Sequence, residues 1–370
     1  MTSEWRRQRA LCVDDDHAIE NWFNPGGEKF ELLAKYGNPL DIVGLKSNIV
    51  ADFKGQIDSI RESRIALYQS DRVESVRKCP ACEVSSDQAK YQFSVYDARY
   101  NQCQNCGHVF VSPQPTAQAM DAFYAKSTDY SSTYTDIPSA MLRVAQIGAP
   151  RVQWVTETFE RRFGRKPEHV LDVGAGGGHF VRACRDAGLR AEGVEISAPS
   201  RQFAHDHFGI ELINQDFTTD FDFGQPDVIT FWGVIEHVTL PASFVEAAAR
   251  RIGNDGLVAA AVPRWNCLDT GTQSFFNDSV VRHLDPLGHI NCFSDNSLVH
   301  LFSRFGFDPV AVWYFGMDAY ELLMQCGLRS GDPEFFDRMK VAIPTLQAAI
   351  DKAALSDEIA LAVTLRAHGD

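Results

Sequence analysis

Three glycines that follow a short apolar run could hold a ligand against the main chain. The run Val170–Val173 predicts a β-strand, and Gly174, Gly176 and Gly178 predict a tight turn before a helix. Glycine allows such a turn and lets a ligand approach the backbone without meeting a Cβ atom. A dinucleotide fingerprint would place a glycine where His179 stands, so the spacing favours a ligand that has no pyrophosphate group.

Carboxylates follow the next two predicted strands. Glu195 ends the second run, 23 residues after Asp172, and could accept hydrogen bonds from both hydroxyls of a ribose. A third short run, 211–214, leads to Asp216 and Phe217, which we expect to meet the amino group and the ring of an adenine. These residues together predict a site for an adenosine-containing ligand.

The glycine turn, the acidic strand end, the acidic loop and a later strand that ends in I-E-H resemble the class I S-adenosylmethionine-dependent methyltransferases over about residues 166–315. The resemblance implies an α/β fold with a Rossmann-like seven-stranded sheet, and S-adenosylmethionine as the cofactor. A dinucleotide site and a cofactor-free α/β domain are the alternatives. The implied cofactor-binding residues are Asp172, Gly174, Ala175, Gly176, Gly178, Glu195, Ile196, Asp216, Phe217 and Trp232.

Four cysteines have the spacing of a metal site. Cys79 with Cys82, and Cys103 with Cys106, form two C-x₂-C pairs separated by 20 residues. This pattern is typical of a Cys₄ zinc site, in which two turns present paired thiolates to one tetrahedral ion. Four thiolates leave no open position for a substrate, so we expect a structural Zn²⁺ in a small ribbon rather than a catalytic or redox centre.

The end of the fourth predicted strand offers a base. Ligands bind at the carboxyl edge of open α/β sheets, and Glu236 and His237 lie there at the end of the run 227–238. A histidine can accept a proton near neutral pH, so His237 is the predicted catalytic base. Glu236 would orient it or bind an acceptor hydroxyl. The alternative is a structural shelf, because I-E-H occurs in methyltransferases that act on different substrates.

Two further segments are candidates for the acceptor site. In the resembling family an H-I-N-x-F-S segment roofs the acceptor pocket, which implies that His289 and Asn291 face the substrate. Tyr130 and Tyr134 precede the core and could close over the bound ligands. A structural role is the alternative for each of these four side chains.

The chain divides into four predicted parts. A helical N-terminal region (1–78) precedes the zinc ribbon (79–115) and a helical linker or lid (116–165). The methyltransferase domain (166–370) is expected to carry a helical insertion at about 318–355, followed by a closing strand near the C-terminus. Domains of this kind each need their own apolar core, and 370 residues suffice for two or three of them.

The amino-acid composition limits the classes of molecule that this protein is expected to bind. A net charge of −14 disfavours nucleic acid, which usually needs a clustered basic face, and favours a small-molecule acceptor. No apolar run approaches the roughly 20 residues that span a bilayer, and no secretory signal is apparent, so we expect a cytoplasmic protein without membrane contact. A monomer or a homodimer is expected.

A zinc ribbon ahead of this core is similar to the bacterial methyltransferases that act on nucleotide-linked deoxysugars and on related polysaccharide precursors. The resemblance implies a carbohydrate acceptor. The sugar C-methyltransferases carry a large further C-terminal domain, whereas here about 55 residues follow the core, so O-methylation of a sugar hydroxyl is the favoured hypothesis. Nucleotide-sugar C-methylation, RNA methylation and a non-catalytic scaffold are the alternatives.

Overall fold

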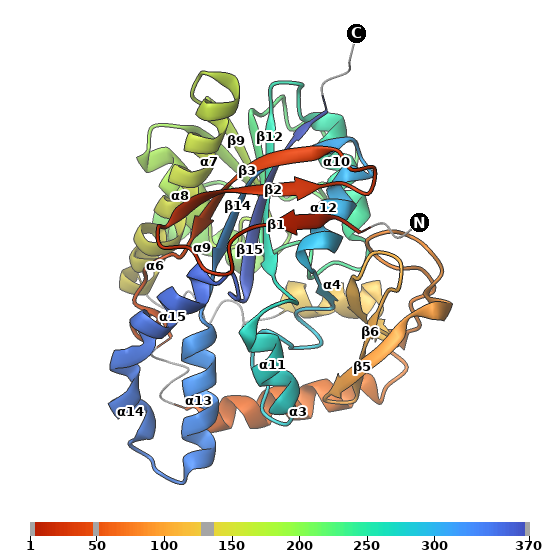
Figure 1. Ribbon diagram of the computed structural model, residues 1–370, viewed down its shortest axis with the longest axis vertical. Coiled ribbons are helices and arrows are strands. Elements are labelled where there is room, and N and C mark those ends of the chain that lie inside the picture. The colour runs from red at the N-terminus through yellow and green to blue at the C-terminus, as the bar shows by residue number, and fades with distance from the viewer. Residues whose placement is uncertain (1–3, 47–51, 127–136, 367–370) are drawn as a thin grey trace.

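A mixed nine-stranded sheet forms the centre of the computed structural model, which describes residues 4–46, 52–126 and 137–366 (Figure 1). Its strand order is β1–β2–β3–β14–β15–β12–β11–β9–β10. Two separate apolar clusters lie on the two faces of the sheet, under helices. The strands are β1 (Arg6–Gln8), β2 (His17–Phe23), β3 (Lys29–Tyr36), β9 (His169–Val173), β10 (Arg190–Val194), β11 (Val228–Trp232), β12 (Leu257–Pro263), β14 (Phe307–Phe315) and β15 (Glu358–Leu365). The helices on its faces include α7 (Ala149–Phe163), α8 (His179–Asp186), α9 (Ala198–Phe208), α10 (Pro241–Arg251) and α12 (Asp295–Ser303).

Four neighbouring strands carry the predicted glycine turn. β10, β9, β11 and β12 pair in parallel, and every residue of β9 and β12 is buried. Strands covered on both faces read as continuous apolar runs, which is why the sequence located them. β15 runs antiparallel between β12 and β14. The predicted α/β fold with a Rossmann-like sheet is confirmed, although the run 211–214 forms only one bridge, between Ile213 and Val194, instead of a seventh strand.

The prediction of a helical region over residues 1–78 is wrong for its first half. β2 and β3 form an antiparallel hairpin, β1 pairs with β2, and β3 pairs in parallel with β14, so these strands extend the main sheet. In β3 the buried residues Leu32, Ala34 and Tyr36 alternate with exposed or half-buried ones. This period of two, together with the Pro25-Gly26-Gly27 turn, was the available signal for a hairpin. Among the described residues of this region, the helices are α1 (Ile42–Leu45) and α3 (Phe53–Tyr68).

The cysteine pairs lie in loops beside a second sheet, one pair before β5 and the other between β6 and β7. Its order is β13–β7–β6–β5, and its strands are β5 (Lys90–Val95), β6 (Ala98–Gln102), β7 (Val109–Val111) and β13 (Asn291–Cys292). β13 comes from the loop after β12, about 180 residues after β7, and pairs antiparallel with β7. The ribbon is therefore not separate from the main domain, because its fourth strand belongs to the segment that was expected to roof the acceptor site. The short strands β4 (Val73–Glu74) and β8 (Gln114–Pro115) pair beside it.

Helices lie along the carboxyl edge of the main sheet. α4 (Ala117–Lys126) and α6 (Ile137–Arg143) precede α7, and α6 joins α7 through the π-helical turn η3 (Val144–Gly148). α11 (Leu268–Phe275) follows β12. The segment between β14 and β15 contains α13 (Asp318–Ser330), α14 (Phe335–Met339), the 3₁₀ turn η4 (Lys340–Ala342) and α15 (Ile343–Lys352). In the described part of the chain, no helix is both long enough and apolar enough to cross a membrane.

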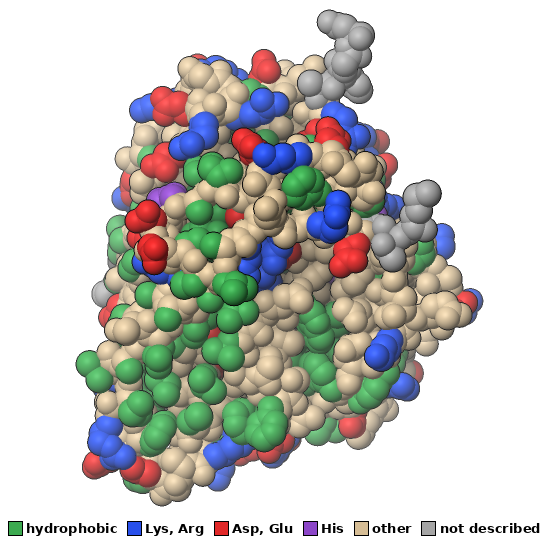
Figure 2. All heavy atoms as spheres, viewed as in Figure 1, with side chains coloured by type: hydrophobic (Ala, Val, Ile, Leu, Met, Phe, Trp, Pro, Cys, Tyr) green, Lys and Arg blue, Asp and Glu red, His purple; other side chains and the backbone are tan. Residues whose placement is uncertain are grey.

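The helices between β14 and β15 are apolar on two sides. Their inner side packs on α1 and α3 in a cluster that includes Ile42, Phe53 and Leu323. On the outer side, Val341 is 82% exposed, and apolar side chains gather over α13 to α15 and α11 at the lower left of the face in Figure 2.

A buried ion cluster ties the N-terminal strands to the main domain. Asp295, the first residue of α12, accepts hydrogen bonds from Arg264 Nε at 2.5 Å and from Nη2 at 2.8 Å, and it also contacts Arg7 on β1. Burial alone would raise the pKa of Asp295, but the two guanidinium groups outweigh it and lower the pKa to about 2. The carboxylate therefore stabilises the fold only while it is ionised.

We expect Asp295→Asn to lower the free energy of unfolding by about 3–5 kcal/mol at pH 7, because Arg264 would stay buried without its counter-charge. An aspartate in an unfolded chain has a pKa near about 3.9, so the folded carboxylate contributes about 2–3 kcal/mol above that pH. This contribution is lost as the pH falls through about 2, and the variant should lack it. Urea unfolding at several pH values measures both effects.

Asp308→Asn is the matched control for this substitution. Asp308 pairs with Arg366 at 2.9 Å, but the arginine side chain is 54% exposed, so its loss should cost less than about 1 kcal/mol. If the two variants are equally stable, the Asp295 cluster does not hold the N-terminal strands.

Candidate active site

The glycine turn lies at the carboxyl end of β9. Gly174, Gly176 and Gly178 have φ angles of +71°, +53° and +77°, which disfavour residues with a Cβ atom. A Cβ on Gly174 would lie 2.6 Å from a methyl group of Val234, so space as well as backbone angle requires glycine there. The N–H groups of Gly174 and Ala175 donate to the carbonyl of Val194 at 2.8 and 2.9 Å, which fixes the turn against β10.

Glu195 lies directly on this turn. Its Oε2 accepts a hydrogen bond from the N–H of Gly176 at 2.8 Å, and its Oε1 accepts one from the N–H of Ser197 at 2.7 Å. Burial raises the pKa of Glu195, against the lowering effect of these N–H groups. The neighbouring Ile196 side chain is 55% exposed at the same edge. The predicted turn and the predicted acidic strand end are thus in contact.

Three other predicted cofactor residues have different surroundings. Asp172 is buried between β9 and β11, where it accepts from Thr230 Oγ1 at 2.7 Å, and burial raises its pKa to about 7. Asp216 is exposed and accepts from the N–H and the hydroxyl of Thr218, both at 2.8 Å. Phe217 contradicts the expectation that it covers a ligand ring, because it is buried in an aromatic cluster with Phe231 and other rings.

Arg151 is a candidate that the sequence reasoning missed. Its guanidinium lies 4.7 Å from the ring centroid of Trp232, and its closest charged neighbours include Glu358, Asp172 and Glu236. Burial lowers its pKa, and the guanidinium has no hydrogen bond or ion pair with any residue of the described chain. A half-buried guanidinium that forms no ion pair within the described chain suits an anionic group of a ligand. An arginine on a helix ahead of the turn gives no sequence signal of this role.

Glu236, His237 and His289 converge after β11. His237 Nδ1 lies 2.6 Å from the carbonyl of Gly288, and His289 Nδ1 lies 3.0 Å from the carbonyl of His283. A carbonyl can only accept, so each Nδ1 carries the proton and each Nε2 presents its lone pair. Burial lowers the pKa of His237 to about 4 and that of His289 to about 3, so both rings are neutral near pH 7.

The carboxylate of Glu236 completes this cluster. Its Oε1 lies 3.5 Å from His237 Nε2, and its Oε2 is buried without a hydrogen-bond partner in the described part of the chain. Burial raises the pKa of Glu236 well above its ordinary value, although nearby backbone N–H groups lower it. The three side chains offer ligand atoms that all lie within 4.8 Å of one another. The structure therefore brings together three of the predicted acceptor-side residues.

The prediction that Asn291 faces the substrate is wrong. Asn291 is buried in β13, where its Oδ1 lies 3.1 Å from His108 Nε2 of the ribbon and its Nδ2 donates to the carbonyl of Val238 at 2.8 Å. Its backbone N–H donates to the carbonyl of Glu236 at 3.1 Å. Strand pairing with β7 determines this orientation. The other two predicted acceptor residues, Tyr130 and Tyr134, lie outside the described residues.

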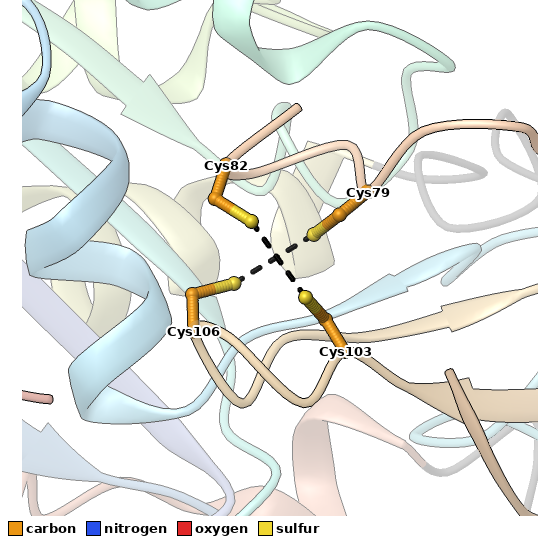
Figure 3. A group of neighbouring side chains, drawn as sticks. All are labelled: Cys79, Cys82, Cys103 and Cys106. Carbon is orange, nitrogen blue, oxygen red and sulfur yellow. Dashed lines mark hydrogen bonds between the residues drawn. The ribbon is translucent and has the colours of Figure 1, made fainter. Parts of the chain in front are cut away.

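The four ribbon cysteines point toward one centre (Figure 3). The Sγ atoms of Cys79 and Cys106, and those of Cys82 and Cys103, are each 3.6 Å apart. A tetrahedral Zn²⁺ with Zn–S bonds of about 2.3 Å needs sulfur atoms about 3.8 Å apart, so the donor set fits this ion. Gly107 has a φ of +71°, and its N–H donates to the carbonyl of Cys103 at 3.0 Å, which closes the second knuckle.

The part of the chain that holds the glycine turn matches known methyltransferases. Residues 149–312 match the family model described as a methyltransferase domain. This part of the chain is similar to methyltransferase domains. The domain match agrees with the predicted enzyme class, and the parallel strands around the turn agree with the predicted fold.

Curated relatives match only this domain. The ubiquinone biosynthesis O-methyltransferases of Erwinia tasmaniensis and Thiobacillus denitrificans are each 30% identical to this chain over 141 residues. The alignments cover 36% of this chain and 57% and 59% of those relatives, less than two thirds of their length. A crystal structure of the plantazolicin methyltransferase BamL with SAH covers 66% of this chain and 96% of its own, at 12% identity and a TM-score of 0.43. The resemblance to nucleotide-sugar methyltransferases stays a prediction.

We expect Glu195→Ala to weaken S-adenosylmethionine binding by about 1.5–3 kcal/mol, the range for hydrogen bonds to a charged group. This corresponds to a dissociation constant raised roughly ten- to a hundredfold. Calorimetric titration measures it, with Glu211→Ala as the control, since the Glu211 side chain is 84% exposed. Unchanged affinity of the Glu195 variant would remove this residue from the cofactor site.

We expect elemental analysis to find zinc, and Cys103→Ser to lower the zinc content by one ion per chain, because a structural site loses its closed coordination with one thiolate. Cys12→Ser, at an exposed cysteine, should leave the content unchanged. Cofactor affinity should persist in both variants, because the glycine turn lies on other strands. Full zinc content after removal of Cys103 would show that the ligand assignment is wrong.

Proposed function

We propose that this protein transfers a methyl group from S-adenosylmethionine to a hydroxyl oxygen of a small molecule. The observation that carries the proposal is the convergence of Glu236, His237 and His289 at the sheet edge that also holds the glycine turn and Glu195. Methyl transfer to oxygen needs a cofactor site, alignment, and a means of removing one proton from the acceptor. Residues at this edge of the sheet could bind the cofactor, align the acceptor and assist removal of its proton.

The cofactor side is proposed to rest on three residues at this edge of the sheet. Bound S-adenosylmethionine supplies an electrophilic methyl group on a positively charged sulfur. Glu195 would accept hydrogen bonds from the ribose hydroxyls, in place of or beside those from the turn. Ile196 would cover the adenine, and Arg151, which lies over Trp232, would bind the carboxylate of the amino-acid part.

The acceptor side is proposed to rest on the cluster of Glu236, His237 and His289. Neutral imidazole rings with Nε2 lone pairs can accept the hydrogen of a hydroxyl group, and the buried Glu236 lies beside them. The curated relatives are named O-methyltransferases, which supports an oxygen acceptor. The carbohydrate acceptor remains a prediction from the sequence, because a sugar hydroxyl and a phenol would meet the same side chains.

We propose that the ribbon binds a structural Zn²⁺ through its four cysteines. The sulfur spacing and the buried position of three of these cysteines support this role. When bound, the ion would hold the two knuckles together without taking part in methyl transfer. The acidic composition, with a net charge of −14, argues against a nucleic-acid partner for the ribbon.

We expect His237→Ala to lower turnover by about 10²–10⁴-fold, because the acceptor proton would lose a group that assists its removal. Release of S-adenosylhomocysteine over a panel of phenols and glycosides measures turnover. The affinity for S-adenosylmethionine should hardly change, since His237 faces His289 and not Glu195, with ring centroids 5.1 Å apart. His205→Ala, at an exposed histidine on α9, is the control. If the His237 variant keeps wild-type turnover, Glu236 and His237 have a structural role and not a catalytic one.

A further inference from the structure

The cluster of Glu236, His237 and His289 consists of electron-pair donors that face one another. Both histidines donate their Nδ1 hydrogen to a backbone carbonyl, so both Nε2 atoms are acceptors. The third group is a carboxylate, and the ligand atoms of the three residues all lie within 4.8 Å. While Glu236 is ionised, these acceptors repel one another, and a positive charge between them would relieve that repulsion.

No basic side chain in the described part of the chain provides that charge. Glu236 has no lysine or arginine within ion-pair distance, and its Oε2 is buried without a hydrogen-bond partner among the residues that the structure describes. Arg151 is among its charged neighbours, but the two form no ion pair. A buried carboxyl group is paired, coordinates a metal or takes up a proton.

A neighbouring acidic cluster shows the contrast. Asp269, His283 and Asp357 also lie within 4.8 Å of one another. Arg282 fills the need for positive charge there, because its Nη2 contacts Asp357 and lies 3.4 Å from Asp269. The guanidinium supplies the positive charge that a cation would otherwise supply. The cluster at Glu236 has the same kinds of ligand atoms and lacks the arginine.

We propose that Glu236, His237 and His289 form a divalent-cation site whose open position takes the hydroxyl oxygen of the acceptor. Two imidazoles and one carboxylate suit Mn²⁺, Fe²⁺, Co²⁺ or Zn²⁺, and three protein ligands leave coordination positions open. The carbonyls of Gly288 and His283 accept from the other ring nitrogens, which is how metal-ligating histidines are usually oriented. The proposal rests on the proposed function and assigns the cluster a role other than that of a histidine base.

The cation would lower the pKa of the acceptor hydroxyl, so its proton passes to water. A lone pair of the resulting oxygen forms the new bond to the methyl carbon, while the carbon–sulfur bond of the sulfonium breaks and its electron pair stays on sulfur. The products are the methyl ether, S-adenosylhomocysteine and one released proton. His237 would then hold the cation through Nε2 and would not itself take the proton.

Titration of the full-length, zinc-loaded protein with Mn²⁺, followed by the electron paramagnetic resonance signal of the free ion, tests the site. Mn²⁺ is used because it does not compete for thiolate ligands, so the ribbon stays occupied by zinc. We expect one Mn²⁺ per chain, and binding at least about tenfold weaker in Glu236→Gln and in His289→Ala. His205→Ala should bind as the wild type does. Circular dichroism shows whether each variant is folded, and Glu236→Gln preserves the shape of the side chain.

Two results would overturn the cation site: wild-type Mn²⁺ binding in both variants, or no uptake of Mn²⁺, Co²⁺ or additional Zn²⁺ by a protein that still transfers methyl groups. The second result would leave the proposed function intact and would make His237 the base. Failure of the proposed function is distinguishable, because it would appear as no binding of S-adenosylmethionine and no methylation, whatever the Mn²⁺ titration shows. Turnover that rises with added Mn²⁺ in the wild type, but not in Glu236→Gln, supports the site.

Discussion

Parallel pairing of β10, β9, β11 and β12 is the constraint on which the site depends. Parallel strands end at one edge, so residues that are far apart in the sequence, such as Gly176, Glu195 and Glu236, meet there. Contact between Gly174 and Val234 then ties the turn after β9 to the loop after β11. A change in the position of one strand would therefore alter the cofactor side and the acceptor side together.

The ribbon packs against the segment that carries part of this site. β13 pairs with β7, and the carbonyl of Gly288 and the side chain of His289 lie just before β13. Asn291 connects His108 of the ribbon to the backbone at Glu236 and Val238. A zinc ion that orders the knuckles would in this way also order the segment that holds both histidine rings.

The sequence predicted what depends on local patterns and missed what depends on packing. Buried parallel strands leave apolar runs, and paired cysteines leave a fixed spacing, so β9, β12 and the cysteine cluster could be found. The hairpin of β2 and β3 was missed because its alternation is weak, with half-buried residues on both faces. Asn291 and Phe217 were assigned to ligands because no local pattern reveals a strand of two residues or an aromatic core formed by distant rings.

Charge compensation separates the groups that build the fold from those that are available to ligands. Asp285 and Asp295 are buried, and each accepts two hydrogen bonds from an arginine, Arg64 and Arg264 respectively. Their charges therefore stabilise the fold and are not available to a ligand. Arg151 is a half-buried cation and Glu236 carries a buried carboxyl group, and the two do not pair with each other. Leaving both uncompensated would be costly in the absence of bound groups. Bound ligands would supply the missing opposite charges, an anion at Arg151 and a cation at Glu236.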